Sequence, residues 1–292
     1  MQTNSITHNI IKTSINTNDN IHILSDSSMS LFDNYISNID NTLVFPLSSE
    51  NHDYSISYDI IVSHNPIAFS SRINSLIALH LNSMLYFHAR CPNNFKKEDR
   101  FLFKNSTTAS FKVFASEAIM NSWGFSLQDN RVSILEYGLN PPSQPCNKTR
   151  SVVVLNTNNN PSVNTLFQYI INVFKDAVII NDSKGDKVYK ALRESAICVE
   201  AESSFNALSA ISQGCYVLSS LDYLKEDGLF LIESYNEIIK SIHQLLQSYN
   251  VEDASRYQNN ILQKYSNLSF KQSFIKTIDN IKQEPYIYAQ TN

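Results

Sequence analysis

One segment of the chain, residues 196–220 (AICVEAESSFNALSAISQGCYVLSS), limits the possible folds more than any other. An apolar run ends in a polar loop, and a short helical stretch follows with apolar residues at positions 205, 208 and 211. Gly214 ends that stretch, and a second apolar run begins at Cys215. This order predicts strand, loop, helix and strand, as in an open parallel sheet. Anionic ligands bind such sheets where a strand ends and a helix begins, so residues 200–206 form a candidate anion-binding loop.

The same alternation of apolar runs and helical stretches fills both halves of the chain. A polar segment rich in Pro, Ser and Asn, from Asn140 to Arg150, separates the halves. We therefore predict an α/β protein of two Rossmann-like domains with parallel sheets flanked by helices. The domains are expected at 1–145 and 150–270. Residues 271–292 are expected to form a C-terminal helix and tail, for which packing back on the first domain is one arrangement. The expected strands are 21–24, 42–46, 58–63, 83–88, 112–116, 132–136, 151–155, 177–180, 197–199, 215–218 and 229–232.

Composition argues against several classes of protein. The net charge of −4 does not favour a generally basic nucleic-acid coat, and five glycines in 292 residues leave no Gly-rich phosphate loop. The four cysteines form no CxxC pair and no His/Asp/Glu set has metal-ligand spacing, so no metal site is predicted. The polar N-terminus lacks a signal core and no apolar run is long enough to span a bilayer. A cytoplasmic protein is expected, in the host cytoplasm if a phage encodes it.

Four stretches resemble the GT-B type of glycosyltransferase, close to the large retaining group that uses nucleotide sugars ("glycosyl transferases group 1"). The resemblance covers roughly residues 58–220. It rests on the order and spacing of the stretches YDIIVSHNP, MLYFHARC, KVFASEAIMNSWGF…VSILEYGLN and AESSFNALSAISQGCYVLSS. The first two resemble strands that lead to the acceptor and sugar sites, the third the passage into the interdomain linker, and the fourth the donor-site motif.

This resemblance implies an enzyme, a hexosyl- or pentosyltransferase, that moves a sugar from a nucleotide sugar to an acceptor hydroxyl. The implied reaction is retaining and metal-independent, without a cofactor, and the co-substrate is UDP- or GDP-linked. Two acceptors remain open: a surface glycan, or a hydroxylated base in phage DNA. A basic cluster between Arg90 and Lys104 suits DNA, although a solvated helix face is the favoured interpretation of it. Oligomeric state is not predicted.

Candidate site residues follow from the loop chemistry and from the resemblance. Hydroxyls and N–H groups at a helix start can stabilise a departing diphosphate, but the same serines are good helix caps. Glu202, or Glu200, is a candidate acceptor for sugar or ribose hydroxyls, and a solvated loop carboxylate is the alternative. His88 is the expected catalytic residue, with a satisfied core histidine as the alternative. The expected donor-binding residues are Thr157, Asn158, Glu202, Ser203, Ser204, Phe205 and Asn206, and the expected acceptor-binding residues are His64, Asn65 and Arg90.

Two departures from the family pattern support a rival hypothesis. Ser209 stands where the family has a second donor-site carboxylate, and the usual basic pair after the first C-domain strand is replaced by the run LNTNNN at 155–160. A catalytically degenerate GT-B scaffold that acts as a binding protein is therefore the alternative. A nucleotide-sugar epimerase is a second rival, for which the chain is short.

Overall fold

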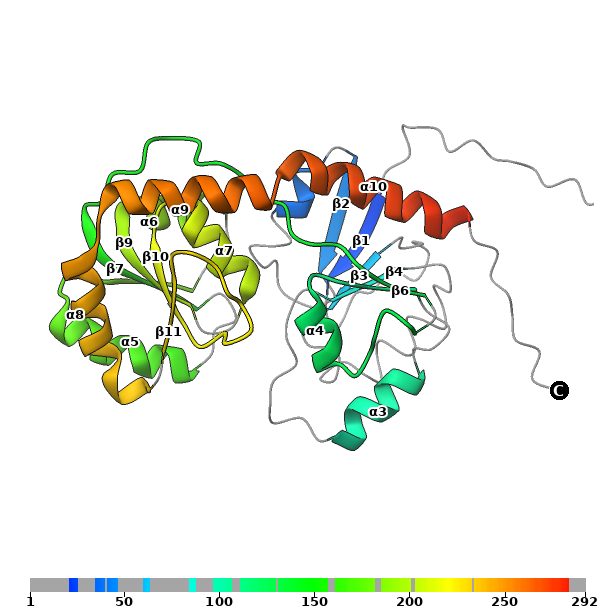
Figure 1. The fold of residues 1–292 in the computed structure, drawn as a ribbon, viewed down its shortest axis with the longest axis horizontal. Helices are drawn as coiled ribbons and strands as arrows, with labels where there is room; N and C mark the ends of the chain where they lie inside the picture. The colour runs from blue at the N-terminus through cyan, green and yellow to red at the C-terminus, as the bar shows by residue number, and fades with distance from the viewer. Residues whose placement is uncertain are drawn as a thin grey trace, which may run out of the picture.

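The chain forms two parallel sheets joined by a linker and by a C-terminal helix (Figure 1). This computed structural model describes residues 21–25, 35–39, 41–46, 60–63, 84–87, 97–106, 111–129, 131–156, 161–181, 185–200, 203–232 and 234–283. Each expected strand is present, with its ends shifted by a residue or two. The prediction of an α/β protein with two parallel, helix-flanked sheets is confirmed.

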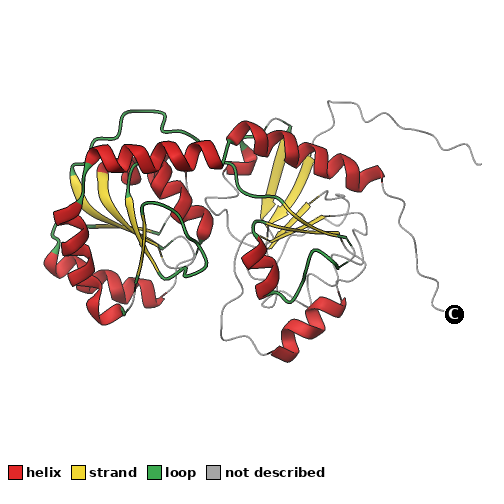
Figure 2. Ribbon diagram, in the orientation of Figure 1, coloured by secondary structure: helices red, strands yellow, loops and turns green. Residues whose placement is uncertain are grey.

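The N-terminal sheet, whose strands are yellow in Figure 2, has the strand order β2-β1-β3-β4-β5-β6, and every pair is parallel. Its core is aromatic, because Trp123, Phe114 and Phe125 are all buried. The elements are β1 (Ile21–Ser25), β2 (Thr42–Pro46), β3 (Ile60–Ser63), β4 (Met84–Phe87), α3 (Lys97–Ser106), β5 (Phe111–Phe114), α4 (Glu117–Ser122) and β6 (Val132–Ile134).

The C-terminal sheet has the order β11-β10-β9-β7-β8, again all parallel. Counted from its own first strand, this is the doubly wound order 2-1-3-4-5. Its elements are β7 (Arg150–Leu155), α5 (Pro161–Val173), β8 (Val178–Ile180), α6 (Gly185–Glu194), β9 (Ser195–Glu200), α7 (Ser204–Ser212), β10 (Tyr216–Ser219), β11 (Leu229–Leu231), η1 (Tyr235–Glu237), α8 (Ile238–Ser248), α9 (Val251–Lys264) and α10 (Asn267–Gln283).

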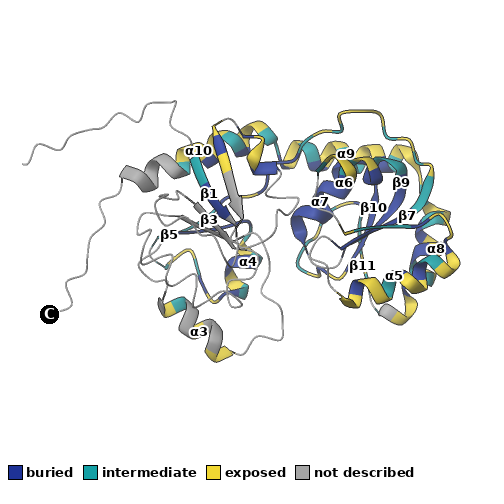
Figure 3. Cartoon of the chain, turned by 180° about the vertical axis from the view of Figure 1, so that it is seen from behind, coloured by how far each residue is buried: buried dark blue, intermediate teal, exposed yellow. Residues whose placement is uncertain are grey.

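Both faces of the C-terminal sheet are covered, as its continuous apolar strands require. Alternate residues point to opposite faces: Ile197 and Val199 pack with α5 and α8, whereas Cys198 packs with α6, α7 and α9. Helix α7 is buried on all sides, and it is dark blue along its length in Figure 3. The side of α7 that does not face its own sheet is therefore also covered by protein. The N-terminal half of the chain provides part of this cover, as the contacts below show.

The last two helices return the chain toward the N-terminal sheet. α9 ends near the linker, where the Leu139 N–H donates to the Tyr265 carbonyl at 3.1 Å. From there α10 extends over the N-terminal sheet (Figure 1), and its buried Phe270 ring lies 5.5 Å from the Tyr35 ring. The Tyr35 hydroxyl donates to Asn267 Oδ1 at 2.5 Å, so the start of α10 is tied to the N-terminal half.

Candidate functional site

The amino end of α7 lies at the point where the C-terminal sheet reverses its strand order. β7 and β9 are the central neighbours, and the chain leaves them in opposite directions, toward β8 and toward β10. In open α/β sheets, ligands bind outside the carboxyl ends of the strands at this switch point. β9 ends at Glu200 and α7 begins at Ser204, so the candidate loop occupies that place.

Glu200 is an internal carboxylate and is not solvated. Its side chain is buried, with Oε1 accepting the Ser203 N–H at 3.0 Å and Oε2 accepting from Asn206 Nδ2 at 2.9 Å. A negative charge is favourable at a helix amino end, where the N–H groups and the helix dipole point toward it. The interpretation of Glu200 as a solvated loop carboxylate is therefore wrong, because the residue closes the turn between β9 and α7.

Both candidate serines of the loop are engaged within the protein. Ser203 is the N-cap of α7, and its Oγ accepts the Asn206 N–H at 3.3 Å, as the capping alternative predicts. Ser204 Oγ lies 2.9 Å from the Tyr137 hydroxyl in a buried hydrogen bond. Tyr137 follows β6, so this bond connects the amino end of α7 to the other sheet.

Phe205 extends the same connection with apolar contacts. Its ring is fully buried, 5.4 Å from the Tyr35 ring and 5.2 Å from the Tyr137 ring. Such aromatic contacts add to the burial of apolar surface. Burial raises the pKa of Tyr35, and the nearby Tyr189 raises it further, so Tyr35 stays a neutral hydroxyl at physiological pH. The start of α7 is consequently the centre of an aromatic interface between the two halves.

Ser209 lies in the middle of α7 and is completely buried. Tyr189 of α6 lies against it, and burial raises the pKa of that tyrosine to about 12. A carboxylate at position 209 would therefore face a neutral phenol instead of solvent. The small serine side chain fits this buried position beside Tyr189.

The structure brings together four of the predicted donor-binding residues, Ser203, Ser204, Phe205 and Asn206, at one helix end. Sequence reasoning missed their partner Tyr35, which no motif marks, and did not foresee the contact of Tyr137. The first C-domain loop is described up to Asn156, whose Nδ2 donates to Asn164 Oδ1 at 2.9 Å. The remaining predicted residues lie outside the described residues: His64, Asn65, His88, Arg90, Thr157, Asn158 and Glu202.

The described part of the basic cluster is partly neutralised. Lys104 Nζ lies 3.3 Å from Asp129 Oδ2 and donates to the Gly124 carbonyl at 2.5 Å. Among the described residues, no group of three or more His, Cys, Asp and Glu side chains is arranged to hold a metal ion. No helix in the described ranges has the length and apolar character needed to cross a membrane.

No family model matches this chain, and no curated protein sequence matches it significantly. Solved structures do match it. A glycosyltransferase involved in avilamycin A biosynthesis, AviGT4, is 8% identical with a TM-score of 0.53, and the match covers 89% of this chain and 98% of that one. The apo lipopolysaccharide outer core galactosyltransferase WaaB is 9% identical with a TM-score of 0.52, over 89% and 99% of the two chains.

Sucrose-phosphate synthase from Thermosynechococcus elongatus is 9% identical with a TM-score of 0.52, covering 77% of this chain and 74% of that chain. At such low identities these similarities establish the fold alone. The chain therefore has the GT-B fold of two Rossmann-like domains, as the sequence resemblance predicted.

Proposed function

We propose that this protein is a glycosyltransferase that binds a nucleotide sugar at the carboxyl edge of the C-terminal sheet and transfers the sugar to an acceptor hydroxyl. One observation carries the proposal: the amino end of α7 lies at the switch point of the C-terminal sheet and contacts Tyr35 and Tyr137 of the N-terminal half. A ligand at that edge would lie between two domains, as ligands of α/β proteins commonly do. The names of the structurally similar proteins support sugar transfer.

In this proposal the donor is a UDP- or GDP-linked hexose or pentose, and transfer is retaining and metal-independent. The α7 residues are already engaged, so the diphosphate would lie beside them, between the loop at 157–160 and residues 201–204. There Thr157, Asn158 and Glu202 would supply hydroxyl, amide and carboxylate groups to the nucleotide sugar. His88 would contact the transferred sugar, and His64, Asn65 and Arg90 would bind the acceptor.

Movement between the halves would complete this site. The contacts at the start of α7 are aromatic packing and one neutral hydrogen bond. Contacts of this kind can separate and re-form without leaving a buried charge unpaired. Enzymes with a cleft between domains use such closure to exclude water from the reaction.

A binding protein on a degenerate GT-B scaffold is the second candidate, and two observations favour it. The Glu200 carboxylate already occupies the amino end of α7, where it would repel a diphosphate. Ser209 is buried where the family has a donor-site carboxylate. This candidate predicts ligand binding without turnover.

A panel of UDP-, GDP-, CDP- and TDP-sugars separates the two candidates. The transferase proposal expects one donor to raise the thermal unfolding midpoint and to be hydrolysed slowly without acceptor. Glu202→Ala and His88→Ala should each reduce hydrolysis at least about tenfold, a change of about 1.4 kcal/mol in the barrier. Asn172→Ala, an exposed change on α5, serves as the control. Binding without hydrolysis would favour the degenerate scaffold, and no binding to any donor would contradict the transferase proposal.

The acceptor is tested separately by DNA binding at several salt concentrations. A hydroxylated-base acceptor predicts binding that weakens steeply as salt increases, because phosphate contacts release counterions. Negligible binding at every salt concentration would leave the glycan acceptor.

A further inference from the structure

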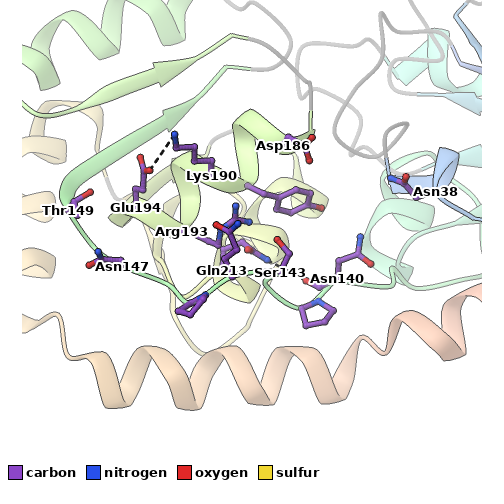
Figure 4. A pocket seen from close by; sticks show the side chains of 14 residues that line it. Asn38, Asn140, Ser143, Asn147, Thr149, Asp186, Lys190, Arg193, Glu194 and Gln213 are labelled. Carbon is purple, nitrogen blue, oxygen red and sulfur yellow. Dashed lines mark hydrogen bonds and ion pairs between the residues drawn. The ribbon is translucent and has the colours of Figure 1, made fainter.

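A recess beneath the interdomain linker lies apart from the amino end of α7. We call it the linker groove: a cavity of about 900 Å³ between the linker and α6, lined by Asn140, Asn147, Asp186, Tyr189, Arg193 and Gln213 among others. In Figure 4 the linker runs along α6, with Asn147 and Thr149 at one end and Asn38 at the other. Ten residues of α6 give the groove a length of about 15 Å.

The groove is rich in groups that both donate and accept hydrogen bonds. Its described lining contains amide, hydroxyl and charged side chains and two prolines, with no aliphatic side chain. The formal charges of the lining balance, because Lys190 and Arg193 carry two positive charges and Asp186 and Glu194 carry two negative ones. Arg150, beside the lining, also pairs with Glu194, with its Nε 3.3 Å from Oε2, so the groove and this neighbour carry one net positive charge at most. A polyanion such as DNA gains little from a site with so small a net charge, whereas a neutral polyhydroxylated ligand can use each amide and hydroxyl.

Gln213 provides an independent indication that a ligand belongs here. Its side chain is only 1% exposed, and its Nε2 donates to the Asn140 carbonyl at 3.4 Å and to Ser212 Oγ at 3.2 Å. Its Oε1 is buried without a hydrogen-bond partner among the described residues. Burying an unsatisfied acceptor costs about 1–3 kcal/mol. A ligand hydroxyl that donates to this amide would remove that cost.

The wall of the groove is fixed in place by the linker itself. Lys148 Nζ donates to the carbonyls of Leu192 and Gln213, both at 2.9 Å. The Cys146 thiol also approaches the Gln213 carbonyl, at 3.2 Å. These contacts attach the linker to the carboxyl ends of α6 and α7, so the groove exists without a ligand. Preformed sites of this kind bind with a smaller loss of conformational entropy.

We propose that the linker groove binds a neutral carbohydrate chain through its amide and hydroxyl side chains, with Gln213 accepting a sugar hydroxyl. This site differs from the proposed donor site, because Gln213 follows the carboxyl end of α7, about 14 Å along the helix from the loop at 200–204. A glycan bound there touches the linker, α6 and, at Asn38, the N-terminal half. The proposal stands or falls independently of the transferase activity.

Calorimetric titration of the full chain with maltohexaose, cellohexaose, mannohexaose and chitohexaose tests the proposal. We expect at least one of these neutral hexasaccharides to bind, and a heparin hexasaccharide and a short DNA duplex not to bind. Asn147→Ala and Asp186→Ala should each weaken that binding about tenfold, the equivalent of one hydrogen bond of about 1.4 kcal/mol. Both residues are exposed on the groove, so the variants should fold, and Asn172→Ala on α5 is the matched control.

Three results would overturn the proposal. The first is that no neutral hexasaccharide releases or absorbs heat at about 1 mM. The second is that wild type and both groove variants bind the glycan with equal affinity. The third is that a nucleotide sugar displaces the bound glycan. The last result would assign the groove to the donor. Because donor hydrolysis is measured without any glycan, failure of the groove proposal leaves the transferase test intact, and the reverse also holds.

Discussion

The two ends of helix α7 are held by different kinds of contact. At the amino end, Glu200 and Ser203 of the same loop satisfy N–H groups, and Tyr137 and Phe205 join the N-terminal half. At the carboxyl end, the Lys148 ammonium donates a hydrogen bond to the Gln213 carbonyl. Gln258 of α9 also donates there, to the Ser212 carbonyl at 2.7 Å. A cation at a helix carboxyl end is favoured by the helix dipole.

This difference indicates which end of α7 is free to change its contacts when the two halves of the molecule move relative to each other. The carboxyl end is bound by the Lys148 ammonium of the linker and by the Gln258 amide of its own domain, so it is held within the C-terminal half. The amino end has, besides Glu200 and Ser203 of its own loop, partners in the other half, and those partners are rings and a hydroxyl. Substitutions at the amino end should therefore weaken the coupling between the unfolding of the two halves. Substitutions at the carboxyl end should instead lower the stability of the C-terminal half.

The largest effect is expected for Phe205→Ala. Removing a buried ring typically costs about 3–5 kcal/mol of unfolding free energy, and this ring joins the two halves. Urea unfolding can be followed by far-UV circular dichroism and by fluorescence of Trp123, the single tryptophan, which is buried in the N-terminal half. We expect the two transitions to coincide in wild type and to separate in the variant.

Phe167→Ala is the matched control, because Phe167 packs between α5 and the far face of the C-terminal sheet. Phe167→Ala should lower the free energy of unfolding by a similar amount. The transition seen by Trp123 fluorescence should still coincide with the one seen by circular dichroism. If Phe205→Ala cost less than about 1 kcal/mol, the aromatic interface would not connect the halves.

A smaller loss is expected for Gly138→Ala, which tests how closely the halves approach. An alanine Cβ at this position would overlap the Tyr35 hydroxyl and lie 2.5 Å from Phe270 Cβ. Overpacking of this kind costs about 1–3 kcal/mol, and here it should push α10 away from the N-terminal sheet. Gly124→Ala is the comparison, since nothing lies within 4 Å there and only its positive φ of 78° is strained, at about 1 kcal/mol.

Fluorescence of Trp123 and circular dichroism again report the result. A Gly138→Ala variant as stable as the Gly124→Ala variant would show that α10 adjusts its position freely.

Next in size is Lys148→Met, which removes the ammonium shared by the ends of α6 and α7 while keeping a long side chain. The Leu192 and Gln213 carbonyls would lose a charge-assisted donor, which corresponds to about 2 kcal/mol. Lys225→Met, at an exposed loop position, should change stability by less than about 0.5 kcal/mol. Circular dichroism during urea unfolding measures both variants. Equal stability of the two variants would mean that water replaces the ammonium at no cost.

The same contrast explains what the sequence predicts and what it leaves undetermined. Strand positions follow from local patterns, so short apolar runs such as 152–155 are found as buried strands, with successive residues packed on opposite faces of the sheet. The cap at Ser203 is also local, since an N-cap serine bonds to a residue three positions on.

Contacts made across the chain are not predicted in this way. Tyr35 meets Phe205 and Asn267 after long loops, and nothing in the neighbouring sequence marks the pairing. The role of Lys148 is similar, because its partners are carbonyl groups that every residue carries. The linker groove was missed for the same reason: it is built from polar residues that, taken along the chain, resemble an ordinary linker.

The smallest expected effect concerns Ser203, and it asks whether the amino end of α7 is held by its cap or by Glu200. Ser203→Ala removes the acceptor for the Asn206 N–H, and loss of an N-cap costs about 1 kcal/mol. Ser203→Thr keeps the hydroxyl and should retain wild-type stability in urea unfolding. If Ser203→Ala were as stable as Ser203→Thr, Glu200 alone would hold this end, since it already accepts from the Ser203 N–H and from the Asn206 side chain. In that case the serine hydroxyl would be unnecessary for the fold, and its presence at the switch point would favour a role in binding the nucleotide sugar.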